Sequence, residues 1–235
     1  GHGGSDPGAV FGNRHEKNDN LAYALELKRL FEAQGCEIIM ARTGDTALSL
    51  TQRTTMANSA KADVYLSCHR NAGGGTGIEL WLHHQAPARY ISWAQDMIAG
   101  FKALPMPIRN SLNANRVSEG VFKGYPGAPT SNFAVNRETT MPSMLIELGF
   151  MGKDDAPFDS HYKAYAEVIA RATCKFLGVE YKTVQPPGGN IPDPAIQLAQ
   201  ITKERDEALT RAEAAEVSTS ALLDDFQTLI DKYKA

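Results

Sequence analysis

Two histidines and two glutamates lie where their side chains could carry out hydrolytic chemistry. His2 lies in the glycine-rich run GHGGSDPGA, which predicts a turn with room beside the imidazole. His69 closes the apolar, β-prone segment 64–68, and Glu16 opens a long amphipathic segment. Two imidazoles and one carboxylate bind catalytic zinc and leave a fourth position for water, whose pKa then falls to about 7. We therefore expect His2, Glu16 and His69 to hold Zn²⁺.

These three residues also have simpler interpretations. His2 could be a loop histidine with no ligand role, and His69 could be a hydrogen-bonded residue at a strand end. Glu16 could be a charge that the dipole of a helix N-terminus favours, with its neighbour His15 as the ligand instead. The sequence pattern alone leaves these alternatives open.

The second glutamate has a different setting. Glu147 interrupts the apolar run MLIELGF at 144–150, which is typical of a buried strand. Burying a carboxylate is costly unless a cation lies nearby, and a metal ion would be such a cation. Glu147 is therefore the candidate catalytic base for the water. The alternative is a structural ion pair between Glu147 and an arginine such as Arg137 or Arg116.

The order of these motifs resembles that of the zinc-dependent N-acetylmuramoyl-L-alanine amidases (amidase type 3 family) of bacterial cell-wall enzymes and phage endolysins. The resemblance spans residues 1–180. It comprises GHGGSDPGA, the helix start at 15–17, LTQRTTMAN at 50–58, SCHRNA around His69, GIE at 77–79 and IELGF around Glu147. In that family the matching residues bind zinc and catalyse, which implies a zinc site at His2, Glu16 and His69 and a catalytic role for Glu147.

The resemblance implies an enzyme that hydrolyses the amide bond between N-acetylmuramic acid and L-alanine in peptidoglycan. Asn71, Glu79 and Arg70 follow His69 closely and are further candidates for substrate contacts. Two alternatives stay open. The chain could be a zinc carboxypeptidase or endopeptidase acting on the stem peptide, or a non-catalytic module that binds the cell wall.

The chain departs from the family pattern in three places. It begins at Gly1, whereas the family has a strand before the first histidine, so any export signal would lie outside this sequence. Cys68 and Arg70 flank His69 where the family has an aliphatic and a small residue. The segment 105–142 is the least similar and is expected to shape substrate choice.

Composition narrows the class of protein. The chain has 235 residues, of which 43% are hydrophobic, enough for one catalytic domain and an appendage. A net charge of -3 gives no basic footprint for nucleic acid, and no stretch is apolar enough to span a membrane. Cys36, Cys68 and Cys174 occur singly, which indicates free thiols. Their odd number fits folding in a reducing bacterial cytoplasm, as in a phage or prophage endolysin that then acts in the cell wall or periplasm.

Hydrophobic periodicity predicts an α/β fold with a twisted, mostly parallel sheet, helices on both faces and a long C-terminal helix after it. We expect helices at 16–33, 48–60, 86–104 and 159–177, and strands at 36–40, 64–69, 78–83 and 144–147. The segment 105–142 is rich in Asn, Gly and Pro and predicts loops over a site.

The last part of the chain differs in kind from the rest. We expect a catalytic domain at 1–180, a Pro/Gly linker at 181–194 and a helix at 195–235. Apolar and small residues step by three and four along this helix, as in a coiled-coil seam, although Arg205 and Thr219 interrupt the pattern. The seam predicts a homo-oligomer or docking against another domain, and the alternative is a solvated helix.

Overall fold

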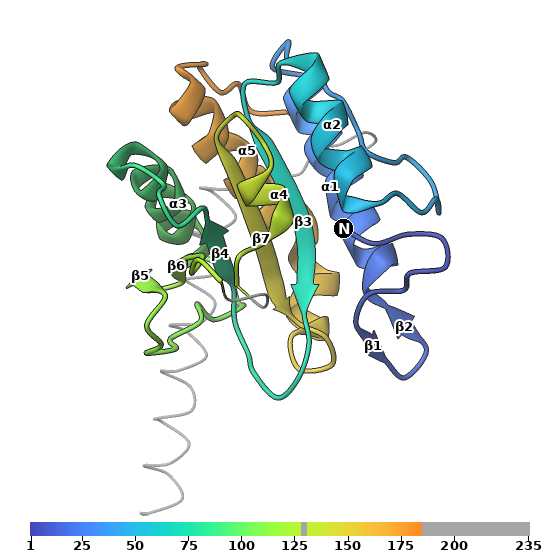
Figure 1. Cartoon of the computed structure of the whole chain (residues 1–235). Coiled ribbons are helices and arrows are strands. Elements are labelled where there is room, and N and C mark those ends of the chain that lie inside the picture. The colour runs from blue at the N-terminus through green and yellow to red at the C-terminus, as the bar shows by residue number, and fades with distance from the viewer. Residues whose placement is uncertain (128–130, 185–235) are drawn as a thin grey trace, which may run out of the picture. The chain divides into compact units, whose positions relative to one another are not determined.

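The structure, a computed structural model, describes residues 1–127 and 131–184, which belong to one compact unit. A five-stranded sheet in the order β3-β7-β4-β6-β5 forms its centre (Figure 1). The strands are β3 (Tyr65–Asn71), β4 (Glu79–Leu82), β5 (Arg116–Ser118), β6 (Val121–Lys123) and β7 (Ser143–Phe150). A separate two-stranded hairpin pairs β1 (Val10–Phe11) with β2 (Arg14–His15).

Three long helices pack on one face of the sheet. They are α1 (Glu16–Glu32), α3 (Ala88–Phe101) and α5 (Asp155–Leu177). Tyr23, Met97 and Tyr165 from these helices are buried in one cluster with Leu80 and Ile146 from the strands. The periodicity of the sequence therefore located these helices correctly, because each buries an apolar stripe. The same cluster contains two of the expected free thiols, those of Cys68 and Cys174.

The opposite face of the sheet is covered less completely. The short helix α4 (Ala134–Arg137) packs on β7 from this face, whereas α5 packs on β7 from the opposite face (Figure 1). A smaller hydrophobic cluster packs on this face and comprises Trp81, Phe122, Val135 and Leu145. The helix α2 (Leu50–Ala60), which the sequence predicts at 48–60, borders α4. Its start is fixed by reciprocal hydrogen bonds between Ser49 and Gln52, a capping box.

The register of the sheet brings three polar side chains together. β3 runs parallel to β7 with His69 opposite Glu147, and β4 runs antiparallel to β7 with Glu79 opposite Glu147. Residues opposite one another in neighbouring strands project from the same face of a sheet. His69, Glu147 and Glu79 therefore form a row across three strands, on the less covered face.

The α/β class is confirmed, but the sheet is mixed rather than mostly parallel. The pairs β3–β7 and β4–β6 are parallel, whereas β4–β7 and β5–β6 are antiparallel. Only residues 72–78 connect β3 to β4, and this connection contains no helix. A return to the same strand direction takes about a dozen residues or more, so this short connection reverses the chain.

Two other expectations about elements differ from the structure. The strand expected at 36–40 is not formed, because within the described residues this segment pairs with no other strand, although Ile38 packs on the core. An extended segment whose side chains are alternately buried and exposed shows the same sequence pattern as a strand, even when it pairs with no other strand. The segment 105–142, expected to form loops, contains β5, β6 and α4, which are too short to give a periodic signal.

The folded unit extends beyond residue 180. Tyr181 and Val184 pack against the main core, and the backbone of Lys182 exchanges two hydrogen bonds with the Gln34 side chain, at 2.7 and 2.9 Å. The start of the expected linker therefore belongs to the folded unit. The remainder of the linker, the helix at 195–235 and its expected self-association fall outside the described residues. Within the part of the chain that the structure describes, no helix combines the length and apolarity needed to cross a membrane.

Candidate metal centre and active site

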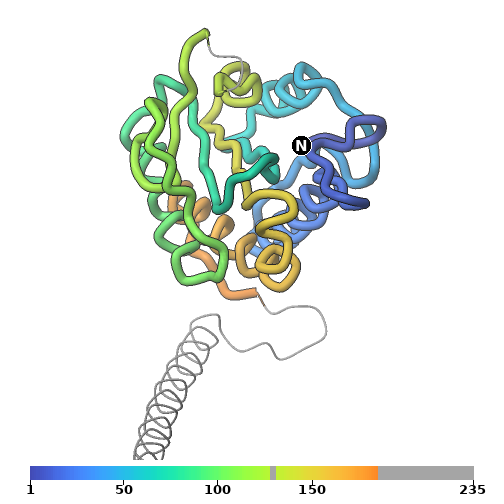
Figure 2. The backbone as a smooth tube through the Cα atoms, turned by 90° about the horizontal axis from the view of Figure 1, so that it is seen from below, coloured from blue at the N-terminus to red at the C-terminus, as the bar shows by residue number. Residues whose placement is uncertain are grey.

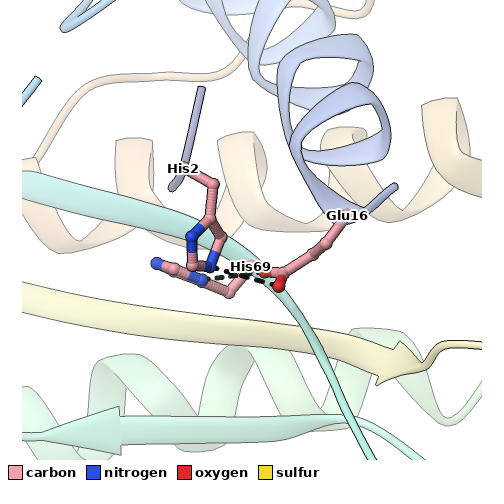
Figure 3. Close-up of side chains that lie close together, drawn as sticks. All are labelled: His2, Glu16 and His69. Carbon is pink, nitrogen blue, oxygen red and sulfur yellow. Dashed lines mark hydrogen bonds and ion pairs between the residues drawn. The ribbon is translucent and has the colours of Figure 1, made fainter. Parts of the chain in front are cut away.

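The three expected ligands converge although they come from separate segments (Figure 3). His2 lies in the N-terminal loop, Glu16 is the first residue of α1 and His69 lies near the end of β3. Their ligand atoms all lie within 4.8 Å of one another. Glu16 Oε2 is 3.1 Å from His2 Nε2, and Glu16 Oε1 is 2.9 Å from His69 Nδ1. Seen from below, the N-terminal segment and the start of α1 lie on one side of the molecule, with residues 85–125 on the other (Figure 2).

The carboxylate of Glu16 is held by donors on all sides. Glu16 is 3% exposed. Its Oε1 accepts hydrogen bonds from the backbone N–H of Arg70 and from Asn20 Nδ2, one helical turn along α1, and its Oε2 accepts one from the backbone N–H of Ala9. Burial opposes ionisation, but the hydrogen bonds with the two imidazoles outweigh it and hold the pKa of Glu16 far below its usual range. The group is therefore an anion, as a carboxylate that binds a metal must be.

The conformation of the loop around His2 places Nε2 of the imidazole next to Glu16. His2 has a φ of 57°, which is uncommon for a residue other than glycine. Asp6 Oδ2 lies 2.7 Å from His2 Nδ1, and a partner of this kind fixes the tautomer and orientation of a metal-binding imidazole. At Gly8, a Cβ atom would lie 2.5 Å from both Glu16 Oε2 and the His2 ring, so the loop needs a glycine there. Asp6 was not among the residues expected at the site, although it lies in the same run, GHGGSDPGA.

The two imidazoles differ in how readily they take up a proton. Burial lowers the pKa of His69 to about 4, so its ring is neutral at neutral pH. Burial also works against protonation of His2, but the hydrogen bonds with Glu16 and Asp6 raise the pKa of His2 overall. Because only neutral imidazole binds a metal, His2 is the candidate ligand at which a proton and a metal ion would compete.

Glu147 lies beside this cluster on the same face of the sheet, opposite His69. Its Oε2 atom is buried and has no hydrogen-bond partner in the described structure. Burial, followed by the negative charges of Glu16 and Glu79, raises the pKa of Glu147 well above its usual range. A carboxyl group in this state is poised to exchange a proton with a bound molecule.

Two of the alternatives, an arginine partner for Glu147 and His15 as the ligand, disagree with the described contacts. Arg137 pairs with Glu138, and Arg116 donates to Asn110, so neither arginine neutralises Glu147. His15 ends β2 and precedes α1, and it is not part of the ligand cluster within residues 1–127 and 131–184.

The side chain of Arg70 has a structural place rather than a place facing the site. Its guanidinium group is fully buried, with Nη1 2.7 Å from both Asp19 Oδ2 and Asp155 Oδ1. It also donates to the backbone carbonyls of Leu148 and Phe150, at 3.2 and 3.1 Å. The side chain of Arg70 therefore does not make the expected substrate contact, and only the backbone of Arg70 faces the candidate ligands.

Asn71 and Glu79 form a connected pair next to Glu147. Asn71 Nδ2 donates to Glu79 Oε2 at 3.2 Å, and Trp81 Nε1 donates to the same oxygen at 3.0 Å. The other oxygen of Glu79 lies 3.0 Å from Arg109 Nε in an ion pair. Asn71 lines the groove over the cluster, whereas Glu79, 7% exposed, lies behind it. Of the two, Asn71 is the one placed to touch a substrate.

That groove has a volume of about 890 Å³. One part of its lining is polar and comprises His2, Glu16, His69, Asn71 and Glu147. The other part comprises the apolar side chains of Leu50, Phe133, Ala134, Val135 and Leu145, with Arg137 among them. The candidate ligands and the candidate base therefore face one groove, which has room for a ligand larger than a single residue.

Comparison with known proteins identifies the family of the chain. The family model described as N-acetylmuramoyl-L-alanine amidase (Amidase_3) matches residues 1–178. The N-acetylmuramoyl-L-alanine amidase CwlM of Bacillus licheniformis is 36% identical over 173 residues, 73% of this chain and 62% of the relative. The sporulation-specific N-acetylmuramoyl-L-alanine amidase of Bacillus subtilis is 30% identical over 96% of this chain and 83% of the relative.

Solved structures show the same relationship. The catalytic domain of the amidase CwlV from Bacillus (Paenibacillus) polymyxa superposes with a TM-score of 0.63 at 30% identity, over 77% of this chain and 96% of that domain. An N-acetylmuramoyl-L-alanine amidase from Clostridium difficile 630 gives a TM-score of 0.62 at 30% identity, over 76% of this chain and 93% of its own. The chain belongs to the Amidase_3 family of N-acetylmuramoyl-L-alanine amidases.

Proposed function

We propose that this chain is a zinc-dependent hydrolase that cleaves the amide bond between N-acetylmuramic acid and L-alanine in peptidoglycan. The observation that carries the proposal is the convergence of His2, Glu16 and His69 beside Glu147 in one groove. Family membership supports the choice of bond, because the relatives from Bacillus licheniformis and Bacillus subtilis are named for this reaction.

The residues present fit a zinc ion. Two imidazoles and one carboxylate are the donor set of many catalytic zinc sites. Glu16 is held as an anion and His69 is held neutral, which are the protonation states that ligands need. Asp6 provides the second contact that orients His2. When bound, Zn²⁺ would polarise the amide carbonyl and increase the acidity of water.

The protein itself supplies the proton transfer. Glu147 accepts the proton of the attacking water and returns it to the alanine nitrogen as the amide bond breaks. Its raised pKa suits a group that must hold the proton between these two steps. Asn71, fixed by Glu79, lies at the edge of the same groove and can orient the substrate.

The variant Glu147→Gln tests the role of the base. It should keep its zinc, measured by elemental analysis, and lose at least about 100-fold in turnover, because general acid–base catalysis typically contributes that much. Turnover is followed as loss of turbidity of purified cell walls, with and without chelator. Glu119→Gln is a matched control, since the side chain of Glu119 is 41% exposed and pairs with Lys102. A fully active Glu147→Gln enzyme would refute this role.

Analysis of the digestion products distinguishes the proposed reaction from its alternatives. A new N-terminal alanine identifies cleavage after the lactoyl group, whereas a new terminus within the peptide identifies a carboxypeptidase or endopeptidase. Binding to cell walls with no product at all would indicate a non-catalytic module. The four site residues favour catalysis, since each is present and placed in the groove.

We also propose that the enzyme acts on the cell wall, outside the cytoplasm. Relatives of this chain include proteins named as probable cell wall amidases of Staphylococcus aureus. These relatives and the two from Bacillus are bacterial proteins, so a phage origin stays a prediction. Self-association through 195–235 also stays a prediction. Light scattering of the full chain and of a version ending at Val184 tests it, and two monomeric masses would contradict it.

A further inference from the structure

The apolar side of the groove carries one arginine whose donors are only partly used. Arg137 lines the groove, and its side chain is 42% exposed. Nη1 donates to the backbone carbonyl of Asn132 at 2.7 Å, and Nη2 pairs with Glu138 at 2.6 Å. A guanidinium group has five N–H donors in a fixed fork, so several stay free for a ligand.

The helix that carries Arg137 is anchored to the sheet. Asn136, 5% exposed, donates from Nδ2 to the backbone carbonyl of Trp81 at 2.8 Å. Val135, 4% exposed, packs in the cluster with Trp81 and Leu145. The guanidinium group therefore projects from a fixed platform next to the strand that carries Glu147, as a specificity contact requires.

Arg137 pairs with Glu138, but the carboxylates that line the groove do not pair with it. The other arginine at the groove, Arg70, forms ion pairs with Asp19 and Asp155 on the helix-covered side of the sheet. The lining carboxylates, Glu16 and Glu147, belong to the proposed metal and base positions. The free donors of Arg137 are thus available to an anionic group of the substrate.

The chemistry of a muramoyl peptide limits where such an anion can be. This step rests on the proposed function. The carboxyl group of the lactoyl ether is consumed in the scissile amide, and the N-acetylated sugars are neutral, so the carboxylates lie on the peptide side. Arginine matches a carboxylate with two parallel hydrogen bonds. We propose that Arg137 binds a carboxylate of the stem peptide, the α-carboxylate of its second residue, and so selects peptides in which that group is free.

Binding of two soluble muramoyl peptides tests the proposal. The peptides differ only at the α-carboxyl group of the second residue, glutamate, which is free in one and a carboxamide in the other. Their Kd values are measured by calorimetry on the zinc-loaded Glu147→Gln protein, so that no cleavage intervenes. We expect the free carboxylate to bind roughly 10- to 100-fold more tightly, as expected for hydrogen bonds to a charged group.

Variants of Arg137 in the same background locate the preference. Arg137→Gln should abolish it and leave the Kd of the carboxamide peptide nearly unchanged, and Arg137→Lys should keep only part of it. Arg171→Gln is the matched control, because Arg171 is 41% exposed and also pairs with a nearby glutamate, Glu167. That variant should keep the full preference.

The possible outcomes separate this inference from the proposed function. Equal Kd values for the two peptides, or a preference that survives Arg137→Gln, would overturn the carboxylate subsite. If the enzyme with Glu147 intact still releases N-terminal alanine from both peptides, the proposed function stands without the subsite. If neither peptide binds or is cleaved, the proposed function is itself contradicted, and the subsite with it.

Discussion

The hydrogen bond between Asp6 and His2 orients one proposed metal ligand from outside the cluster. Asp6 is 61% exposed, and its side chain accepts from His2 Nδ1 while Nε2 faces Glu16. Asp6→Asn should weaken zinc binding about 10- to 100-fold, the usual effect of removing such a partner. Competition with a chelator measures this. Asp96→Asn is the control, since Asp96 is 40% exposed and pairs with Lys175. Equal zinc affinity of the two variants would show that Asp6 has no such role.

The protonation of His2 predicts how zinc binding depends on pH. The pKa of His2 is raised and that of His69 is lowered to about 4, so as the pH falls His2 takes up its proton well before His69 does. Zinc must displace that one proton. The Kd for zinc should therefore rise about tenfold for each pH unit below the pKa of His2, and level off above it. A slope near two in log Kd against pH would mean that both imidazoles titrate.

Individual residues also show how far the sequence could predict the site. His2, Glu16, His69 and Glu147 stood in recognisable motifs, and the structure brings all four to one groove. The sequence could not show which way a side chain points from its strand end. Arg70 lies next to His69, yet its guanidinium group turns to the helix-covered side of the sheet. That difference follows from the alternation of side chains along a strand.

At the scale of elements, Arg70 links β3 to α1 and α5, and two of the candidate ligands lie on β3 and α1. From β3 it contacts Asp19 on α1 and Asp155 on α5. Arg70→Met should lower the free energy of unfolding by about 3 kcal/mol, because it removes a fully buried charge that two carboxylates share and leaves Arg14 as their remaining partner. Denaturant unfolding measures the change. Arg171→Met removes a partly exposed pair with Glu167 and should cost less than about 1 kcal/mol. A similar small loss for both variants would refute the structural role of Arg70.

Long elements were predicted well from sequence, and short or partner-dependent ones were not. The helices α1, α3 and α5 each bury a long apolar stripe, which leaves a periodic signal. The strands β5 and β6 span three residues each, too few for a period to appear. The segment 36–40 shows the reverse case, since its pattern suits a strand but the described residues provide no partner. The sequence also gives no direct sign of strand direction, except that the short connection at 72–78 requires β3 and β4 to run in opposite directions.

For the whole folded unit, the candidate zinc site links three segments that lie far apart in the sequence. Its ligands come from the N-terminal loop, from α1 and from β3. A ligand that binds only the folded state stabilises it by RT ln(1 + [L]/Kd), or about 2.7 kcal/mol at a concentration of 100 Kd. Zinc should therefore raise the thermal midpoint of the protein. Because Glu147 is not a ligand in this proposal, Glu147→Gln should keep the shift, while His69→Ala should lose it. If zinc does not change the thermal midpoint of the unmutated protein, His2, Glu16 and His69 do not hold the ion, whatever the activity of the preparation.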